Sequence, residues 1–243
     1  MKIRLDQLVQ QRGLAPTREK AQRLIRSGNI RVAGQVAAKP GHTYAEDVAI
    51  ERIEPEPYVS RGGQKLEAAL HHFNVTVKDA VAIDIGASTG GFTDCLLQHG
   101  AARVYAVDVG KGQLHWDLRN DSRVVVMESF NARDLKPDSL PEHPRLAVVD
   151  VSFISLTKIL PAVTPLLAVQ AEIVTLIKPQ FEAGPEFVGK GGVVRDGAVH
   201  QRVIEEIRTF GTETMGLHWV GVLESPLHGP AGNIEFLAYW RKA

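Results

Sequence analysis

Four charged residues occupy positions in the sequence that a parallel β-sheet would bring together at one of its edges. Asp150 and Lys178 each directly follow an apolar run of strand length. Because the carboxyl ends of parallel strands share one edge of a sheet, both side chains are expected at that edge. Glu235 begins the last strand-like run and reaches the same edge if that strand is antiparallel, and Lys65, in a helix before the first strand, can reach it from the side. Each alone fits a solvated charge at the end of an element, whereas two amines and two carboxylates together can carry acid–base chemistry.

A glycine-rich turn provides a second candidate site at this edge. It joins the apolar run 81–85 to a helical stretch, 92–99, and the next apolar run, 104–107, ends on Asp108. Strand, tight loop, helix and strand form the opening unit of a parallel sheet that binds a ligand at its carboxyl edge. An acidic residue at the end of the second strand suits the hydroxyls of a ribose.

The loop differs from the dinucleotide-binding fingerprint at two positions. Ser88 stands in place of the second glycine, and Asp84 precedes the turn. A carboxylate there repels a pyrophosphate and suits an ammonium group, so S-adenosylmethionine fits better than NAD. The alternative is a glycine-rich turn in some other doubly wound protein. The expected cofactor contacts in this stretch are Asp84, Gly86, Ala87, Ser88, Thr89, Gly90, Gly91 and Phe92.

The order of elements predicts the fold class. Strand-like runs alternate with helical stretches, which indicates an α/β fold with a mostly parallel sheet. These runs are 81–85, 104–107, 124–126, 146–149, 173–177, 219–223 and 234–240.

Charge is unevenly distributed along the 243 residues, although the 28 basic and 28 acidic residues balance overall. Residues 1–44 hold nine lysines and arginines but only Asp6 and Glu19 as acids, a net of +7 that leaves −7 for the remainder. Such asymmetry indicates a polyanion-binding module fused to a second domain. Prolines and acids in 53–57 favour a linker, which we place at 55–60 between domains at 1–54 and 61–243.

The basic segment has the layout of a small RNA-binding module. Thr17 is placed to cap a helix over 18–26, and a hairpin is expected over 30–36. On charge alone, a merely solvated basic face is the more common explanation. The candidate RNA contacts are Arg4, Arg18, Lys20, Arg23, Arg26 and Arg31. The segment RLDQLVQQRGLAPTREKAQRLIRSGNIRVAGQVAAKPGHTY resembles the S4 domain, a family that docks on structured RNA.

Several functional classes are disfavoured by composition. The single cysteine, Cys95, excludes an internal disulfide and a multi-cysteine zinc site, and the histidines show no ligand spacing on one helix. We therefore expect no metal. No apolar stretch approaches membrane-spanning length and residues 1–10 are not a signal sequence, so a cytoplasmic protein without membrane contact is expected.

The four charged residues resemble the K-D-K-E tetrad of FtsJ-like ribose 2′-O-methyltransferases. A ribose hydroxyl must lose its proton as it attacks the sulfonium methyl, and a lysine held as the neutral amine can accept it, which contributes roughly 10²–10⁴-fold in rate. We assign Lys178 as the base, Asp150 and Glu235 as orienting groups, and Lys65 as the residue that steers the hydroxyl.

Over nearly its full length the chain resembles the TlyA family, an S4 domain fused to an FtsJ-like methyltransferase. The matching segments, in order, are SRGGQKL, DIGASTGGFTD, VDVGKGQLHWDLR, NARDL, DVSFISL, IKPQFEAG, GGVVRD and GNIEF. The resemblance implies a Rossmann-like sheet with an antiparallel last strand and a small α+β S4 domain. It also implies methylation of cytidine 2′-hydroxyls in large-subunit ribosomal RNA and, in longer members, in small-subunit RNA. By the same resemblance, Asp108 meets the ribose of S-adenosylmethionine, Asp134 meets its adenine amino group, and Asn131 lies beside them.

Two hypotheses of other classes stand beside this one. Members of the family are also labelled haemolysins, which suggests a membrane-active protein, and an S4 domain on an inactive fold suggests a non-catalytic ribosome assembly factor. Base amino-group methylation is disfavoured because residues 150–156 hold no Pro-Pro-aromatic motif. The oligomeric state and the modified nucleotide stay open.

Overall fold

A computed structural model describes residues 2–53 and 56–243, and its chain divides into two compact units, Met1–Glu56 and Pro57–Ala243. Pro55, the first residue of the expected linker, 55–60, lies outside the described residues. From Pro57 onward it belongs to the second unit, where the Tyr58 side chain is buried.

The first unit is a small α+β module. Its elements are β1 Lys2–Arg4, α1 Leu5–Gln11, α2 Arg18–Arg26, β2 Ile30–Val32, β3 Gln35–Val36, β4 Thr43–Ala45 and β5 Ile50–Arg52. The predicted helix and hairpin are confirmed: β2 pairs antiparallel with β3, and the Thr17 hydroxyl caps α2 by accepting from the Lys20 N–H at 3.2 Å. Apolar side chains of α1, α2 and β2, among them Leu5 and Ile25, close a core of their own.

The second unit is built on a seven-stranded sheet in the order β11-β12-β10-β9-β6-β7-β8. The strands are β6 Val81–Ile85, β7 Arg103–Val107, β8 Val124–Met127, β9 Leu146–Val149, β10 Glu172–Ile177, β11 His218–Glu224 and β12 Phe236–Arg241. The strands from β8 to β10 are parallel to one another, and β12 is antiparallel to β10 and β11. The expected α/β class with an antiparallel last strand is confirmed.

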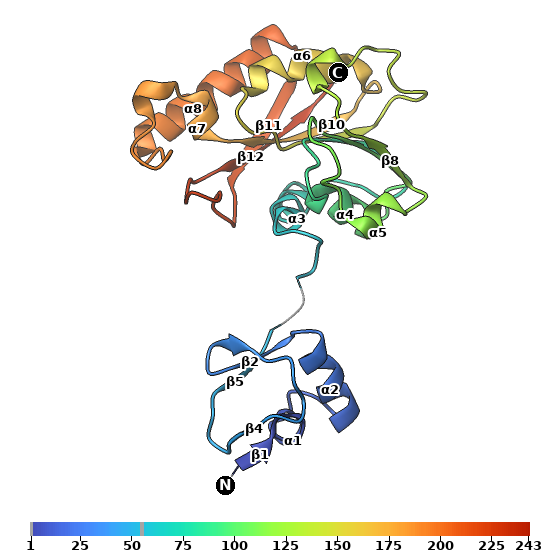
Figure 1. Ribbon diagram of the computed structural model, residues 1–243. Helices are drawn as coiled ribbons and strands as arrows, with labels where there is room; N and C mark the ends of the chain where they lie inside the picture. Colours follow the sequence, from blue (N-terminus) through green and yellow to red (C-terminus); the bar gives the residue numbers. More distant parts are fainter. Residues whose placement is uncertain (1, 54–55) are drawn as a thin grey trace. The chain divides into compact units, whose positions relative to one another are not determined.

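Helices cover both faces of this sheet (Figure 1). Along each strand successive side chains point to opposite faces, so Ile83 and Ile85 enter one core and Ala82 the other. The first core is closed by α6 Leu160–Val163 and α8 Gly197–Thr209, and the second by α3 Gly62–Phe73, α4 Gly91–Gln98 and α5 Trp116–Arg119. The remaining helix, α7 Pro179–Glu182, directly follows β10 and Lys178.

The start of α3 is fixed by backbone contacts. Arg61 occupies the N-cap position, and the Ser60 carbonyl accepts from the Gly63 N–H at 3.1 Å. Gly63 is required there because a Cβ would lie 2.3 Å from the Tyr58 ring. The close approach of Tyr58 therefore decides where α3 begins, and with it the position of Lys65.

Candidate active site

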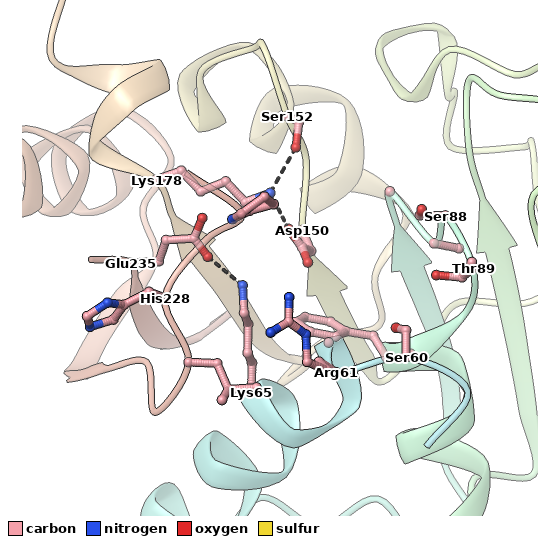
Figure 2. A pocket seen from close by; sticks show the side chains of 17 residues that line it. Ser60, Arg61, Lys65, Ser88, Thr89, Asp150, Ser152, Lys178, His228 and Glu235 are labelled. Atoms are coloured by element: carbon pink, nitrogen blue, oxygen red, sulfur yellow. Dashed lines mark hydrogen bonds and ion pairs between the residues drawn. The ribbon is translucent and has the colours of Figure 1, made fainter. Parts of the chain in front are cut away.

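The four predicted charged residues meet at one edge of the sheet as two ion pairs (Figure 2). Lys178 Nζ lies 2.5 Å from Asp150 Oδ1 and donates to Ser152 Oγ at 3.0 Å. Lys65 Nζ donates to Glu235 Oε2 at 2.6 Å. The contact between Lys178 and Asp150 is an ion pair without good hydrogen-bond alignment, since Asp150 Oδ1 has no hydrogen-bond partner among the described residues.

Sheet topology explains why these residues converge. Asp150 follows β9 and Lys178 follows β10, and the two strands are parallel neighbours. The antiparallel register pairs Ile177 with Phe236, so Glu235, just before β12, lies beside the end of β10. Lys65 arrives from α3, whose apolar side packs against the sheet.

The pairing within the tetrad differs from expectation in one respect. Glu235 was expected to orient Lys178, but its carboxylate accepts from Lys65 and, at 3.3 Å, from Gln180 Nε2. Its side chain is only 1% exposed. Gly229 lies against it so closely that a Cβ would come within 2.5 Å of Glu235 Oε1. Glu235 therefore orients Lys65, and Asp150 with Ser152 orients Lys178.

A cavity of about 290 Å³ opens onto all four residues. One wall is the glycine-rich loop, of which Gly86, Ala87, Ser88, Thr89, Gly91 and Phe92 line the space. The opposite wall includes Leu227, His228 and Pro230, in the segment that leads to Glu235. The cavity thus joins the two predicted sites into one.

A second cavity, about 450 Å³, adjoins the first and shares Gly86, Ser88, Asp150 and Ser152 with it. The Asp108 carboxylate lines it and accepts from the Ser88 N–H at 2.8 Å and the Gly110 N–H at 2.6 Å. Much of the remaining lining is apolar and includes Val107, Val109, Phe130, Ala132, Ile154 and Ile159. An apolar slot beside a carboxylate fits a nucleoside, with the base in the slot and the ribose hydroxyls at Asp108.

Of the two predicted residues on the adenine side, the structure places one in this cavity. Asn131 lines it, and its side-chain oxygen accepts from the Arg133 N–H at 3.1 Å. Asp134 is exposed and is not among the residues that line either cavity, so its contact with adenine stays a prediction.

Asp84 lies beneath the loop rather than in the cavity. Its side chain is fully buried and accepts from Thr93 Oγ1 at 2.6 Å, while Oδ1 has no hydrogen-bond partner among the described residues. Burial, with smaller contributions from the negative charges of Asp150 and Asp108, raises the pKa of Asp84 to about 7. The expectation that Asp84 meets a ligand's ammonium directly is not met, because the protein covers the carboxylate.

The loop glycines serve the protein's own packing. Gly86, at φ +86°, would place a Cβ 2.3 Å from the carbonyl oxygen of Asp150. Gly90, at φ +99°, would place one 2.2 Å from Leu118, and Gly90 does not line either cavity. Glycine at these positions lets the loop lie against the neighbouring strand end and α5, which holds the cavity wall in place.

Several residues of the site escaped the sequence analysis. Ser152 contacts Lys178, and Arg61 and His228 add cationic or polar groups to the first cavity. Phe153 is 90% exposed at φ 63°, lines the second cavity and packs 4.8 Å from the Phe181 ring. The exposure and the left-handed backbone of Phe153 depend on tertiary structure and could not be predicted from the sequence. Its position three residues after Asp150 was the only indication in the sequence that it lies near the site.

Glu128 is a further missed residue, one that shapes the rim. Its carboxylate accepts from Arg119 at 2.7 Å and from the N–H groups of Gly112, Gln113 and Leu114. The Arg119 hydrogen bond, followed by that of Gly112, lowers the pKa of Glu128 to about 2. This ionised carboxylate holds the turn 112–114 beside the second cavity.

The basic residues of the first unit fall into two groups. Arg4 and Arg18 pair with buried Asp6 at 2.9 and 3.0 Å, and the hydrogen bond from Arg4 is the largest of the contacts that hold the pKa of Asp6 far below its usual range. Lys20 and Arg23 are exposed on α2. Arg26, also on α2, is exposed as well, and Arg31 lies 3.8 Å from Glu51. The RNA contacts predicted for all six residues stay a prediction.

Comparisons with known proteins identify two family domains in the chain and several relatives of it. Residues 58–242 match the FtsJ-like methyltransferase family, and residues 3–49 match the S4 domain. TlyA of Mycobacterium tuberculosis (strain ATCC 25618 / H37Rv), named as a 16S/23S rRNA (cytidine-2′-O)-methyltransferase, is 45% identical over 99% of this chain and 90% of its own length. YqxC of Bacillus subtilis (strain 168) is 50% identical over 98% of this chain and 85% of its own length.

Solved structures extend the comparison to the fold. A hemolysin-labelled protein from Streptococcus thermophilus superposes with a TM-score of 0.77 at 46% identity, covering 100% of this chain and 89% of its own. An S-adenosylmethionine-dependent methyltransferase from Mesorhizobium loti, at 14% identity, shares the fold alone, with a TM-score of 0.50 over 72% of this chain and 96% of its own.

No helix within residues 2–53 and 56–243 has both the length and the apolar character needed to cross a membrane.

Both family matches, the near full-length relatives and the sheet topology agree with the motifs quoted above. The chain belongs to the TlyA family, in which an S4 domain precedes an FtsJ-like methyltransferase domain.

Proposed function

We propose that this protein transfers a methyl group from S-adenosylmethionine to the 2′-hydroxyl of a cytidine in ribosomal RNA. The observation that carries the proposal is the shared pocket, in which two lysine–carboxylate pairs lie next to a cavity suited to a nucleoside. The named activity of the M. tuberculosis relative supports the choice of cytidine and ribosomal RNA.

The cofactor would lie across the glycine-rich loop. Asp108 would accept hydrogen bonds from the ribose hydroxyls, and the slot lined by Phe130 and Ile154 would hold the adenine ring. When bound, S-adenosylmethionine would supply a methyl group on a sulfonium centre. The amino-acid end would then point toward Gly86 and the first cavity, which contains the two lysines.

We assign Lys178 as the group that accepts the proton of the 2′-hydroxyl. The 2′-hydroxyl loses its proton as its oxygen becomes an ether. Lys178 Nζ, which Asp150 and Ser152 hold in place, would receive this proton as the neutral amine, after its ammonium form has released a proton to solvent. Lys65, fixed by buried Glu235, would donate to the same oxygen and hold it in line for transfer. Exposed Phe153 offers a flat apolar surface beside Ser152 on which a nucleotide base can stack.

The S4 unit would bind the RNA and take no part in the chemistry. Exposed Lys20, Arg23 and Arg26 on α2 can contact phosphates, which accounts for the charge asymmetry of the chain. An RNA partner and the expected cytoplasmic location both belong to this proposal.

The test is methyl transfer from labelled S-adenosylmethionine to purified ribosomal subunits. A 2′-O-methyl group blocks alkaline cleavage of the adjoining phosphodiester, so hydrolysis of the labelled RNA should leave label in an alkali-resistant dinucleotide that contains 2′-O-methylcytidine. Lys178→Ala should abolish incorporation, while Lys136→Ala, a change at an exposed lysine outside the cavity linings, should not.

Other outcomes would identify the competing hypotheses. RNA binding without label transfer would identify an assembly factor. Dye release from lipid vesicles without label transfer would identify a membrane-active protein. Label in a base would contradict the assignment of the ribose hydroxyl.

A further inference from the structure

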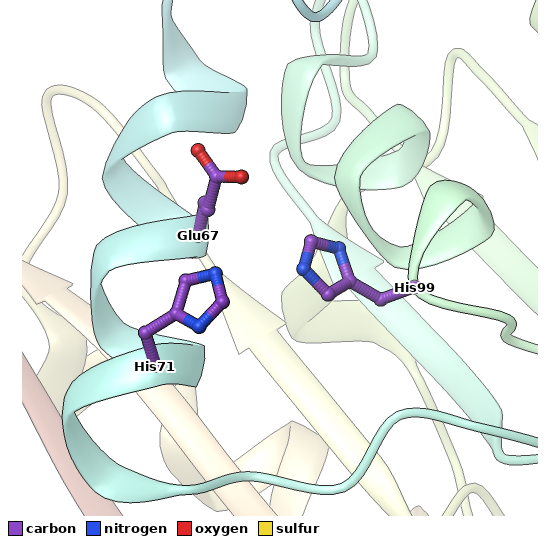
Figure 3. A group of neighbouring side chains, drawn as sticks. All are labelled: Glu67, His71 and His99. Atoms are coloured by element: carbon purple, nitrogen blue, oxygen red, sulfur yellow. The ribbon is translucent and has the colours of Figure 1, made fainter.

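Two helices of the second unit bring together three side chains that can ligate a metal (Figure 3). Glu67 and His71 lie one turn apart on α3, and His99 caps the end of α4. One ligand atom from each lies within 4.8 Å of the other two. Glu67 and His99 are half-buried and His71 is exposed, so a small ion can reach the cluster from solvent.

The His99 ring is already oriented for ligation. Its Nδ1 lies 2.8 Å from the carbonyl oxygen of Cys95. A carbonyl can only accept, so Nδ1 carries the proton and the neutral ring keeps its lone pair on Nε2. A backbone carbonyl on the second ring nitrogen is the usual support of a metal-bound histidine.

The three donors match zinc in chemistry. Zinc binds imidazole nitrogen at about 2.0–2.1 Å and carboxylate oxygen at about 2.0–2.2 Å, which places tetrahedral ligands about 3.3 Å apart. The present spacing, within 4.8 Å, would have to shorten on binding, and His71 is the exposed ligand of the three. Two imidazoles favour zinc over calcium or magnesium, which bind oxygen ligands.

We propose that Glu67, His71 and His99 form a zinc site that joins α3 to the end of α4. Water would complete the tetrahedral shell on the exposed side. The helix α3 also carries Lys65, and α4 begins at Gly91 in the glycine-rich loop, so the ion would fix two walls of the pocket relative to each other. The proposal replaces the expectation of no metal, which considered cysteines and histidines that share one helix but not ligands from two helices.

Zinc binding to the full-length, untagged protein after chelator treatment tests the site. A chromophoric chelator competing for added Zn²⁺ should report one equivalent bound by wild type. Glu67→Gln and His71→Ala should each weaken binding at least tenfold, because each removes a ligand. His72→Ala, an exposed neighbour outside the cluster, is the matched control and should change affinity less than twofold.

Thermal unfolding provides a second measurement. Zinc at a hundred times its dissociation constant should raise the wild-type Tm by about 5 °C or more and leave that of His99→Ala unchanged. Binding of less than one equivalent by wild type would overturn the proposal. Equal loss of affinity in His72→Ala and His71→Ala would overturn it as well.

Discussion

The two lysine–carboxylate pairs of the pocket contain the same kinds of residue but sit in different surroundings. The Glu235 side chain is 1% exposed, accepts a second hydrogen bond from Gln180 and lies closely against Gly229. The Asp150 side chain is 22% exposed, and its partner Lys178 also donates to the Ser152 hydroxyl. The two lysines are equally exposed, so the pairs differ in the carboxylate rather than in the lysine. We propose that the more buried pair, Lys65–Glu235, positions the hydroxyl and that Lys178–Asp150 takes part in proton transfer.

The largest expected effect is the loss of Lys178. Lys178→Ala should slow single-turnover methyl transfer by roughly 10²–10⁴-fold, because a general base contributes in that range. Binding of S-adenosylmethionine, measured by calorimetry, should stay within about twofold. A large loss of cofactor affinity would show that Lys178 belongs to the binding site rather than to the chemistry.

Removing Lys65 should damage the fold as well as the reaction. Lys65→Ala leaves Glu235 charged, buried and without its cation, which costs about 3–5 kcal/mol for a buried pair. Urea unfolding should show that loss, and Lys65→Ala with Glu235→Gln should recover much of it because the charge is removed. If Lys178→Ala proved equally destabilising, the contrast between the two pairs would be wrong.

Asp84 is a buried carboxylate with no lysine, and it should make stability depend on pH. Its pKa is raised to about 7, so between its ordinary value and that pH the folded state binds a proton that the unfolded state releases. Its contribution to stability should therefore fall as pH rises through this range, by at most about 4 kcal/mol. Asp84→Asn keeps an acceptor for Thr93 and should flatten the dependence, with urea unfolding at pH 5 and pH 8 as the measurement. Equal dependence in variant and wild type would contradict the account.

The smallest expected effect concerns the S4 unit, in which some basic side chains pair with buried Asp6 and others are exposed on α2. Lys20→Glu with Arg23→Glu should weaken RNA binding and reduce the slope of affinity against salt by about two, since two exposed phosphate contacts are lost. Arg18→Gln removes a partner of buried Asp6 and should lower stability with little change in slope. Filter binding at several salt concentrations measures the slopes, and a double variant with the wild-type slope would show that Lys20 and Arg23 face solvent only.

The sequence predicted the convergence of the tetrad but not its pairing. Asp150 and Lys178 could be placed because strand ends share an edge, and the antiparallel last strand brought Glu235 to them. That Glu235 turns to Lys65 depends on its contacts with Gly229, in the segment before β12, and with Gln180 on α7, and these contacts depend on tertiary structure. Asp84 lies between Ile83 and Ile85 along β6. The alternation of side chains along a strand therefore predicts that Asp84 points to the opposite face of the sheet, where it is buried. Glu67 and His99 lie on different helices, and only packing brings them together.

The most direct test of the central claim is Lys178→Arg in single-turnover methyl transfer across a range of pH. A guanidinium keeps its charge at any workable pH, so it can hold a hydroxyl but cannot accept its proton. We predict a wild-type rate that rises with pH through one apparent ionisation of the coupled tetrad, and a Lys178→Arg rate as low as that of Lys178→Ala. A Lys178→Arg enzyme with substantial activity would show that Lys178 acts as a fixed cation while another group or water removes the proton.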